Sequence, residues 1–230
     1  MHPCAYTLAE YRELAALCRE LGIAVIPKLQ CVGHVDYVLK HPQFRQLREA
    51  DGASIYQYCV AAQESFDFWR DLADEVLDLF PDVERFHIGA DEAEQEYHCS
   101  RCADQDRFRL FAERVEACAD YLRARGKKVM IWDDVFRYHA SDEYGALADK
   151  TIPCVWQYRA INPDFIGKAV HHGGEVWGAS MLFDNGHYVG WMPLRPRIQN
   201  ILDWRRLGRE YSLTGNIGTC LLYTSDAADD

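Results

Sequence analysis

Short apolar runs alternate with longer amphipathic stretches along most of the chain. Apolar runs of strand length occupy residues 23–29, 84–90, 128–132, 152–157, 175–180 and 211–217. The stretches around them, at 8–21, 63–80, 103–125, 141–149, 163–172 and 196–207, read as α-helices, several of them with apolar side chains at three- to four-residue spacing. Six strands separated by helices of 10 to 20 residues predict a parallel α/β fold.

Two of the predicted helices carry recognisable start signals. Thr7 and Glu10 form a capping box, because each side chain can accept a free backbone N–H of the first turn. Gly22 follows the same helix and suits a C-terminal cap. Asn162 and Pro163 suit the N-cap and the first helical position. We therefore expect helices to begin directly after Thr7 and Asn162.

The ends of the predicted strands favour a barrel. They are polar or aromatic and lack a glycine-rich phosphate loop, which favours a (β/α) barrel over a dinucleotide-binding fold. A closed barrel needs eight strands, so about six of eight βα units are present. We expect an incomplete (β/α)8 TIM barrel whose missing strands precede Met1. Residues 36–62 are expected to form a long polar loop at the mouth of the first strand.

Composition narrows the range of partners. The 230 residues are 49% hydrophobic and 27% charged, as in ordinary globular proteins, and the net charge is −11. An acidic chain without a cluster of Lys and Arg argues against a nucleic-acid partner. No apolar run reaches the length of a membrane span, and the N-terminus does not resemble a signal peptide. Nine scattered cysteines suit a reducing, cytoplasmic compartment, and the oligomeric state stays open.

The last eleven residues need separate treatment. The segment CLLYTSDAADD resembles the translation of a sequencing adapter, and its acidic end does not continue the strand pattern. We therefore expect a partial barrel domain over residues 1–219 and a non-native tail over residues 220–230.

The clearest candidate for chemistry is the end of the apolar run at 84–90. Asp91 and Glu92 follow it directly. Barrel enzymes place their active sites at the carboxyl ends of the strands. Adjacent carboxylates repel each other, so the pair is useful where the two environments differ. Taken alone, the dipeptide is more often a pair of solvated acids at the start of a loop.

The six residues from His87 to Glu92, His-Ile-Gly-Ala-Asp-Glu, change that balance. They resemble the His-x-Gly-Gly/Ala-Asp-Glu signature of the glycoside hydrolase family 20 β-N-acetylhexosaminidases, most closely the hexosaminidase D-like branch. The resemblance implies hydrolysis of terminal β-linked GlcNAc or GalNAc with retention, and without a metal or organic cofactor. It also implies that Glu92 protonates the glycosidic oxygen. Asp91 would orient the substrate's acetamido group, which attacks C1 and forms an oxazolinium ion.

The same resemblance implies a setting for these two acids. Gly33-His34 matches a Gly-His element of the family and would bring His34 beside Glu92. Sugars stack their C–H faces on aromatic rings. Trp132, Trp156 and Trp177 lie at or near the ends of three predicted strands, so we expect them to form an aromatic wall at one depth of the barrel.

Four further polar residues lie at or near the ends of the predicted strands. Tyr158 is the candidate donor to the acetamido oxygen, by analogy with the family's tyrosine. Asp133 is expected to hold a sugar hydroxyl, whereas Asp134 is expected to be solvated or to cap a helix. We assign His87 a packing and hydrogen-bonding role rather than a catalytic one.

Two alternatives remain open. The chain could be a metal-dependent barrel hydrolase that uses His34, His87, Asp91 and Asp133, or a sugar-binding relative without activity. Cys99 and Cys102 form a Cys-x-x-Cys pair, which is half of a zinc site. Nothing downstream supplies a second pair at usable spacing, so structural thiols are the default interpretation.

Overall fold

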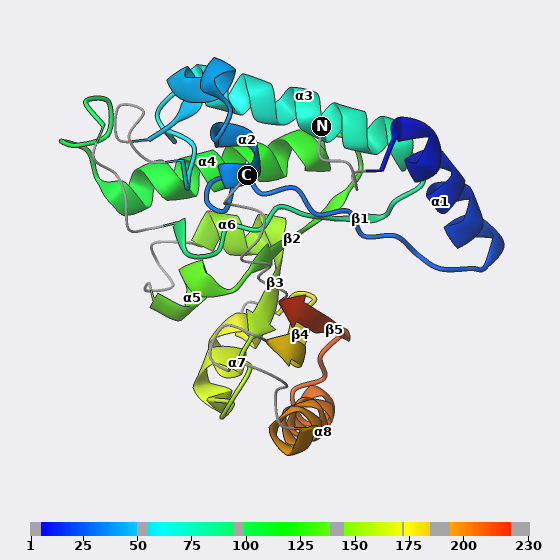
Figure 1. Cartoon of the computed structure of the whole chain (residues 1–230). Coiled ribbons are helices and arrows are strands. Elements are labelled where there is room, and N and C mark those ends of the chain that lie inside the picture. Colours follow the sequence, from blue (N-terminus) through cyan, green and yellow to red (C-terminus); the bar gives the residue numbers. More distant parts are fainter. Residues whose placement is uncertain are drawn as a thin grey trace. The chain divides into compact units, whose positions relative to one another are not determined.

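The computed structural model describes residues 6–49, 55–93, 99–138, 145–171, 173–184 and 194–221. The chain divides into two compact units. The first contains residues 1–131 and 145–151, and the second contains residues 132–144 and 152–230. Figure 1 shows the elements of both units in sequence colours.

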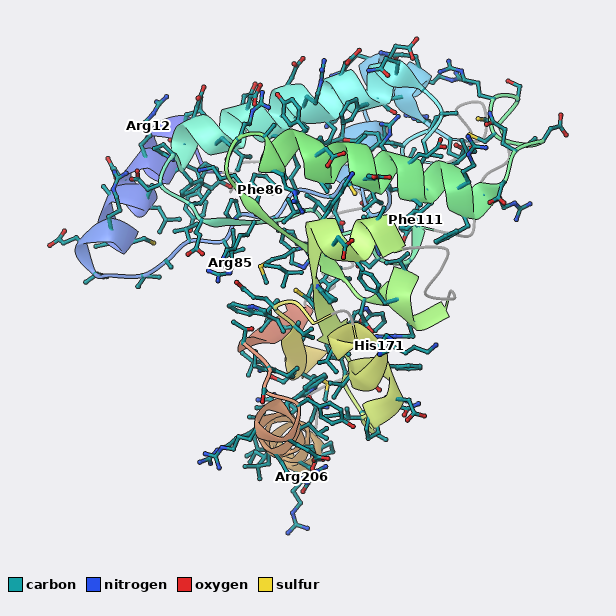
Figure 2. All side chains as sticks on the ribbon, turned by 180° about the vertical axis from the view of Figure 1, so that it is seen from behind. Arg12, Arg85, Phe86, Phe111, His171 and Arg206 are labelled. Atoms are coloured by element: carbon teal, nitrogen blue, oxygen red, sulfur yellow. The ribbon has the colours of Figure 1, made fainter. Side chains whose placement is uncertain are left out.

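The first unit is rich in helices. Its elements are α1 (Leu8–Glu20), α2 (Asp36–Leu39), the 3-10 helix η1 (Pro42–Leu47), α3 (Gln63–Leu79), β1 (Arg85–His87), α4 (Arg107–Arg123), β2 (Lys128–Trp132) and α6 (Gly145–Lys150). β1 and β2 pair in parallel, with Phe86 opposite Val129. Phe86 of β1 and Phe111 of α4 are fully buried (Figure 2). β1 and α4 therefore both contribute side chains to the hydrophobic interior of this unit.

The second unit contains the remaining strands. Its elements are α5 (Asp134–Tyr138), β3 (Thr151–Trp156), α7 (Pro163–Val170), β4 (Trp177–Asp184), α8 (Leu194–Glu210) and β5 (Gly215–Leu221). β4 pairs in parallel with both β3 and β5. A core of Val155, Ile166, Ala169, Val176, Trp204 and Leu207 joins β3 to α7 and α8.

Strand order follows chain order, β1-β2-β3-β4-β5, and the strand pairs described above are parallel. Successive βα units of a (β/α)8 barrel have this arrangement. The predicted fold class, an incomplete TIM barrel, is therefore confirmed.

The predicted helix starts are also confirmed. Thr7 N–H donates to Glu10 Oε2 over 2.6 Å, and Glu10 N–H donates to Thr7 Oγ1 over 3.3 Å, which is the capping box. Asn162 Oδ1 accepts the N–H of Asp164 over 3.0 Å at the start of α7. Gly22, with a φ of +68°, follows the end of α1 as expected.

The first predicted strand, at 23–29, does not form a full ladder. Leu29 N–H donates to His87 O over 2.9 Å, and His87 N–H donates to Pro27 O over 2.9 Å. These bonds make an isolated parallel bridge between Lys28 and His87. The segment therefore lies along β1, in the place predicted for a strand, but pairs over a shorter length.

The last predicted strand begins later than expected. The preceding helix was predicted to end at residue 207, but α8 continues to Glu210. Ser212 then takes a φ of +55°, and Leu213 N–H donates to Gly208 O over 2.8 Å, which closes the helix end. β5 starts only at Gly215. It continues through residues 220 and 221, and residues 222–230 of the predicted tail lie outside the described residues.

The prediction of a long polar loop at 36–62 is wrong for its described part. α2 and η1 form there, and Arg48 bridges Tyr58 in antiparallel fashion. The side chains of Val35, Val38, Leu39, Leu47 and Tyr58 form a small buried core. The apolar residues are too few for each short helix to stand out in the sequence, yet together they bury enough surface to pack. No described helix is long and apolar enough to cross a membrane.

Candidate active site

A tight backbone turn carries the two acids away from β1. Gly89, Ala90 and Glu92 have φ angles of +73°, +68° and +52°. A Cβ at Gly89 would overlap the side-chain amide of Gln30 and displace it, and the positive φ at this position also favours glycine. Positive φ angles at Ala90 and Glu92 are strained for residues with a side chain. Such strain is concentrated at functional sites, because the surrounding structure must hold it in place.

Asp91 is held by two polar side chains. Gln30 Nε2 donates to Asp91 Oδ1 over 3.1 Å, and His34 Nε2 lies 3.4 Å from Asp91 Oδ2. The Asp91 side chain is 18% exposed. These contacts orient the carboxylate and still leave part of it accessible to a ligand.

Glu92 is more open and shares the same histidine. His34 Nε2 lies 3.3 Å from Glu92 Oε2, and the Glu92 side chain is 54% exposed. Tyr56 Oη lies 3.0 Å from the same nitrogen and donates to the Glu92 carbonyl oxygen over 3.5 Å. A protonated Nε2 can donate to either carboxylate, whereas an unprotonated one accepts from Tyr56. His34 therefore lies beside Glu92, as the sequence analysis predicted, while its role in binding substrate stays a prediction.

Sequence reasoning missed two members of this group, Gln30 and Tyr56. A signal for Gln30 was present, because it directly follows the apolar run at 23–29 and so lies at a strand end. Tyr56 gave no signal, since it is one of several aromatic residues in a segment whose fold was not predicted.

His87 lies behind this group and is 4% exposed. Its Nδ1 accepts the N–H of Gly89 over 3.0 Å. Burial lowers the pKa of His87 to about 3, with a smaller contribution from Lys28, so the ring is neutral. The hydrogen bond supports the predicted packing role. In the neutral ring Nε2 then carries the proton, so the one lone pair available to a metal ion is already used by this bond, which weighs against His87 as a metal ligand.

The acids that follow β2 have a different environment. Asp133 is 1% exposed, and Arg137 Nη2 donates to both of its carboxylate oxygens, over 2.8 and 3.0 Å. The backbone N–H of Trp156 donates to Asp133 Oδ1 over 3.1 Å. Burial raises the pKa of Asp133 to about 7, and the Arg137 guanidinium opposes that shift. The role of Asp133 in holding a sugar hydroxyl stays a prediction.

Asp134 is 5% exposed, and its Oδ2 accepts the indole N–H of Trp156 over 2.7 Å. The expectation of a solvated Asp134 is therefore wrong. The alternative expectation placed Asp134 at a helix start, and Asp134 is the first residue of α5, a helix that was not itself predicted.

Of the three tryptophans predicted to form an aromatic wall, two end their strands and the third begins its strand. Trp132 and Trp156 end β2 and β3. The ring of Trp156 lies 5.4 Å from that of Tyr158, and the Arg137 guanidinium covers it at 4.6 Å. Trp177 instead begins β4 and is paired with Cys154, two residues before Trp156. The predicted strand at 175–180 extends further towards the C-terminus, so Trp177 is at its amino end. Sugar binding by these residues stays a prediction.

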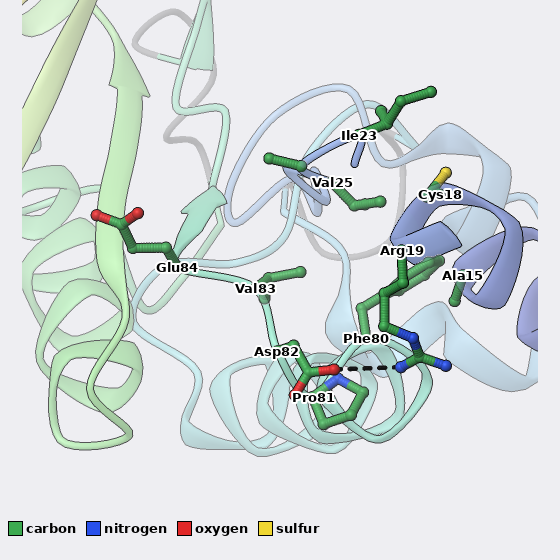
Figure 3. Close-up of a pocket in the computed structure, with 11 residues that line it drawn as sticks. Ala15, Cys18, Arg19, Ile23, Val25, Phe80, Pro81, Asp82, Val83 and Glu84 are labelled. Atoms are coloured by element: carbon green, nitrogen blue, oxygen red, sulfur yellow. Dashed lines mark hydrogen bonds and ion pairs between the residues drawn. The ribbon is translucent and has the colours of Figure 1, made fainter. Parts of the chain in front are cut away.

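A cavity of about 250 Å³ lies between α1 and the segment at 80–84 (Figure 3). Arg19 and Asp82 form an ion pair of 3.2 Å at its rim. The segment at 80–84 precedes β1, whereas Asp91 and Glu92 follow it. The cavity is therefore at the other end of the strand and is separate from the acid pair.

Comparisons with known proteins point to one family. Residues 1–205 match the catalytic domain of glycosyl hydrolase family 20. The chain is 30% identical over 169 residues to hexosaminidase D of Homo sapiens, covering 68% of this chain and 34% of that protein. It is 29% identical over 218 residues to hexosaminidase D of Bos taurus, covering 87% of this chain and 62% of that protein. The chain thus spans between a third and two thirds of the length of these relatives.

Solved structures agree on the fold. A mutant β-hexosaminidase of Streptomyces plicatus in complex with the product GlcNAc has a TM-score of 0.65, at 17% identity over 96% of this chain and 46% of that one. The β-N-acetylhexosaminidase of Bacteroides fragilis has a TM-score of 0.60, at 23% identity over 76% of this chain and 36% of that one. At such identities the likeness concerns the fold alone.

Proposed function

The chain belongs to glycosyl hydrolase family 20, and we propose that its protein is a retaining exo-β-N-acetylhexosaminidase that removes terminal β-linked GlcNAc or GalNAc. The observation that carries the proposal is the pair Asp91 and Glu92. Both follow the carboxyl end of β1, both remain accessible, and both contact His34.

The spacing of the pair favours substrate-assisted catalysis. Ordinary retaining glycosidases place two carboxyl groups about 5 Å apart on opposite sides of the scissile bond, one as acid and one as nucleophile. Adjacent residues that share one histidine are poorly suited to attack from opposite faces. In the proposed reaction the nucleophile is instead the carbonyl oxygen of the substrate's acetamido group.

In the first step the acetamido oxygen forms a bond to C1 while the bond from C1 to the glycosidic oxygen breaks. Glu92 donates its proton to the departing oxygen, and the leaving group departs as an alcohol. The product is an oxazolinium ion, whose positive charge is spread over the former amide. Asp91, oriented by Gln30, is proposed to accept the amide N–H and to stabilise this charge.

In the second step water attacks C1 and the bond from C1 to the acetamido oxygen breaks. Glu92, now a carboxylate, takes a proton from the water and returns to its starting state. Two inversions at C1 give net retention. The exposure of Glu92, at 54%, suits a group that must meet both a leaving group and water.

Two further aromatic residues, Trp156 and Tyr158, are proposed to bind the sugar. Trp156 and Tyr158 are half-buried and in contact, so each offers part of a ring or a hydroxyl to a ligand. Trp132 and Trp177 are included in the proposal on the sequence argument alone.

Two aryl substrates test the proposal directly. The purified protein should hydrolyse an aryl β-N-acetylglucosaminide but not the matching aryl β-glucoside, because the glucoside lacks the internal nucleophile. Similar rates on both substrates would contradict the substrate-assisted mechanism. Binding of GlcNAc without turnover of either substrate would identify a sugar-binding protein instead of an enzyme.

A further inference from the structure

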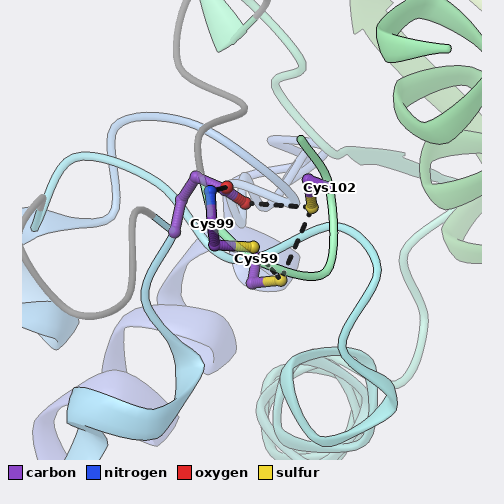
Figure 4. Close-up of side chains that lie close together, drawn as sticks. Cys59, Cys99 and Cys102 are labelled. Atoms are coloured by element: carbon purple, nitrogen blue, oxygen red, sulfur yellow. Dashed lines mark hydrogen bonds between the residues drawn. The ribbon is translucent and has the colours of Figure 1, made fainter. Parts of the chain in front are cut away.

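A second group of reactive side chains lies outside the acid pair. Glu49, Cys59, Cys99 and Cys102, here called the Cys3Glu cluster, are exposed by 0%, 2%, 3% and 0%. They come from three places in the sequence. Glu49 follows Arg48, Cys59 lies before α3, and Cys99 and Cys102 lie before α4. Figure 4 shows the three cysteine side chains gathered at one point.

The spacing of the ligand atoms matches a tetrahedral metal site. Cys59 Sγ lies 3.5 Å from Cys99 Sγ and 3.8 Å from Cys102 Sγ. Cys102 Sγ lies 3.4 Å from Glu49 Oε2, and the four ligand atoms all lie within 4.8 Å of one another. Around a tetrahedral zinc ion with bonds of about 2.3 Å to sulfur and about 2.0 Å to oxygen, ligand sulfurs lie about 3.8 Å apart and sulfur and oxygen about 3.5 Å apart.

We propose that the Cys3Glu cluster binds one zinc ion as a structural site. Four protein ligands complete a tetrahedral shell and leave no position for substrate, which is the mark of a structural zinc site. Three soft thiolates favour zinc over magnesium and calcium, which prefer oxygen ligands. The proposal does not depend on the hexosaminidase activity.

Ordinary packing explains the cluster less well. Buried cysteines often act as small apolar side chains, but an apolar core gains nothing from a carboxylate. Glu49 is fully buried among the thiols, and its Oε1 accepts the N–H of Cys99 over 2.8 Å. A disulfide would join only two of the three sulfurs, and none of the described cysteines forms one.

The positive charge of Arg114 lies close enough to compensate part of the negative charge of a zinc-filled site. Three thiolates, one carboxylate and Zn²⁺ carry a net charge of −2. Arg114 is buried, and it is bonded to the backbone of Val60, the residue that follows Cys59. Its Nη2 donates to the carbonyl oxygens of Val60 and Ala62 over 2.8 and 2.7 Å. The guanidinium therefore offsets part of the negative charge while remaining satisfied by backbone oxygens.

The site would hold one segment that reaches the acid pair. Cys59 N–H donates to Leu47 O over 2.8 Å, and Tyr56, three residues earlier, contacts His34. Zinc binding would thus fix the segment that carries Tyr56, and through it the position of His34 beside the two acids.

Metal content is the direct test. Protein purified without added metal should contain about one zinc per chain by elemental analysis, and Cys102→Ser should lower that content at least fivefold. Cys118→Ser is the matched control, because Cys118 is a fully buried free thiol that lies outside the cluster. The control should keep its zinc.

A second measurement uses only the wild-type protein, so it tests the proposal even where a variant fails to fold. Replacing zinc by cobalt in the wild-type protein should give the intense absorption of tetrahedral cobalt thiolates. Removing zinc with a chelator should lower the melting temperature by about 10 °C, and zinc, but not magnesium, should restore it. Metal-free wild-type protein without cobalt bands would overturn the proposal, and so would a disulfide between Cys59 and Cys99 in the purified protein.

Discussion

Two pairs of adjacent acids follow two strands of the sheet, and their surroundings differ. Asp91 and Glu92, after β1, have side chains 18% and 54% exposed and share contacts with one histidine. Asp133 and Asp134, after β2, are 1% and 5% exposed. Arg137 and Trp156 occupy the oxygens of the second pair.

The difference in surroundings suits the first pair to catalysis and the second pair to stabilising the fold. A carboxylate whose oxygens are all bonded within the fold stabilises that fold and has little capacity left for a ligand. A carboxylate held on one side by an amide or an imidazole can still meet a substrate. We therefore expect substitutions in the first pair to change activity and substitutions in the second pair to change stability.

Glu92→Gln should have the largest effect. Loss of the general acid should reduce kcat on a substrate with a poor leaving group by about 10³-fold, which corresponds to about 4 kcal/mol. Steady-state kinetics with two aryl N-acetylglucosaminides checks the reason. The loss should be much smaller for a dinitrophenyl leaving group, which needs little protonation. Equal losses on both substrates would mean that Glu92 is not the acid.

Asp133→Asn should have the next largest effect, on folding. Above pH 7, where the Asp133 carboxyl is ionised, removing its charge leaves the Arg137 guanidinium buried and uncompensated, so the free energy of unfolding should fall by about 3 kcal/mol. Urea unfolding measures it. Asp91→Asn serves as the comparison and should change stability by less than about 1 kcal/mol. A larger loss for Asp91→Asn than for Asp133→Asn would reverse the roles of the two pairs.

Acid should lower the stability of the folded protein through His87, the last residue of β1. The folded pKa of His87, about 3, is below the unfolded value of 6.5. Between these values the unfolded chain binds a proton that the folded chain excludes, so stability is full above pH 6.5 and is lost as pH falls. Relative to His87→Gln, wild-type stability should fall by about 2 kcal/mol from pH 6 to pH 4.5. Parallel pH profiles for the two proteins would show that His87 is not buried as a neutral ring.

Tyr56→Phe should have the smallest effect. The hydroxyl contacts His34 and the Glu92 carbonyl oxygen, so its loss should loosen the acid by about 1 kcal/mol, or a roughly fivefold fall in kcat. KM should change little, because the proposed contact is with the enzyme's own groups. A change in KM alone would instead place Tyr56 against the substrate.

Local and repetitive features were predictable from the sequence. The alternation of apolar runs and amphipathic helices predicted the parallel fold, and the capping residues Thr7 and Asn162 marked the starts of their helices correctly. The run from His87 to Glu92 identified the acid pair, because its pattern is contiguous.

Features that depend on distant residues were not predictable. Glu49 and Cys59 complete the Cys3Glu cluster, yet they are 50 and 40 residues away from Cys99. The pairing of Asp133 with Arg137 needed the helix α5, which five residues of sequence did not signal. Trp177 was expected at a strand end, but only the register of β3 and β4 shows at which end it lies.

The measurement that tests the central claim most directly compares N-acyl groups. An aryl β-glucosaminide should be prepared with an acetyl, a difluoroacetyl or a trifluoroacetyl group on nitrogen. Fluorine withdraws electrons from the carbonyl oxygen and weakens it as a nucleophile. If that oxygen attacks C1 with the help of Asp91 and Glu92, kcat/KM should fall steadily, by more than about 10²-fold across the series. An unchanged kcat/KM would contradict the account.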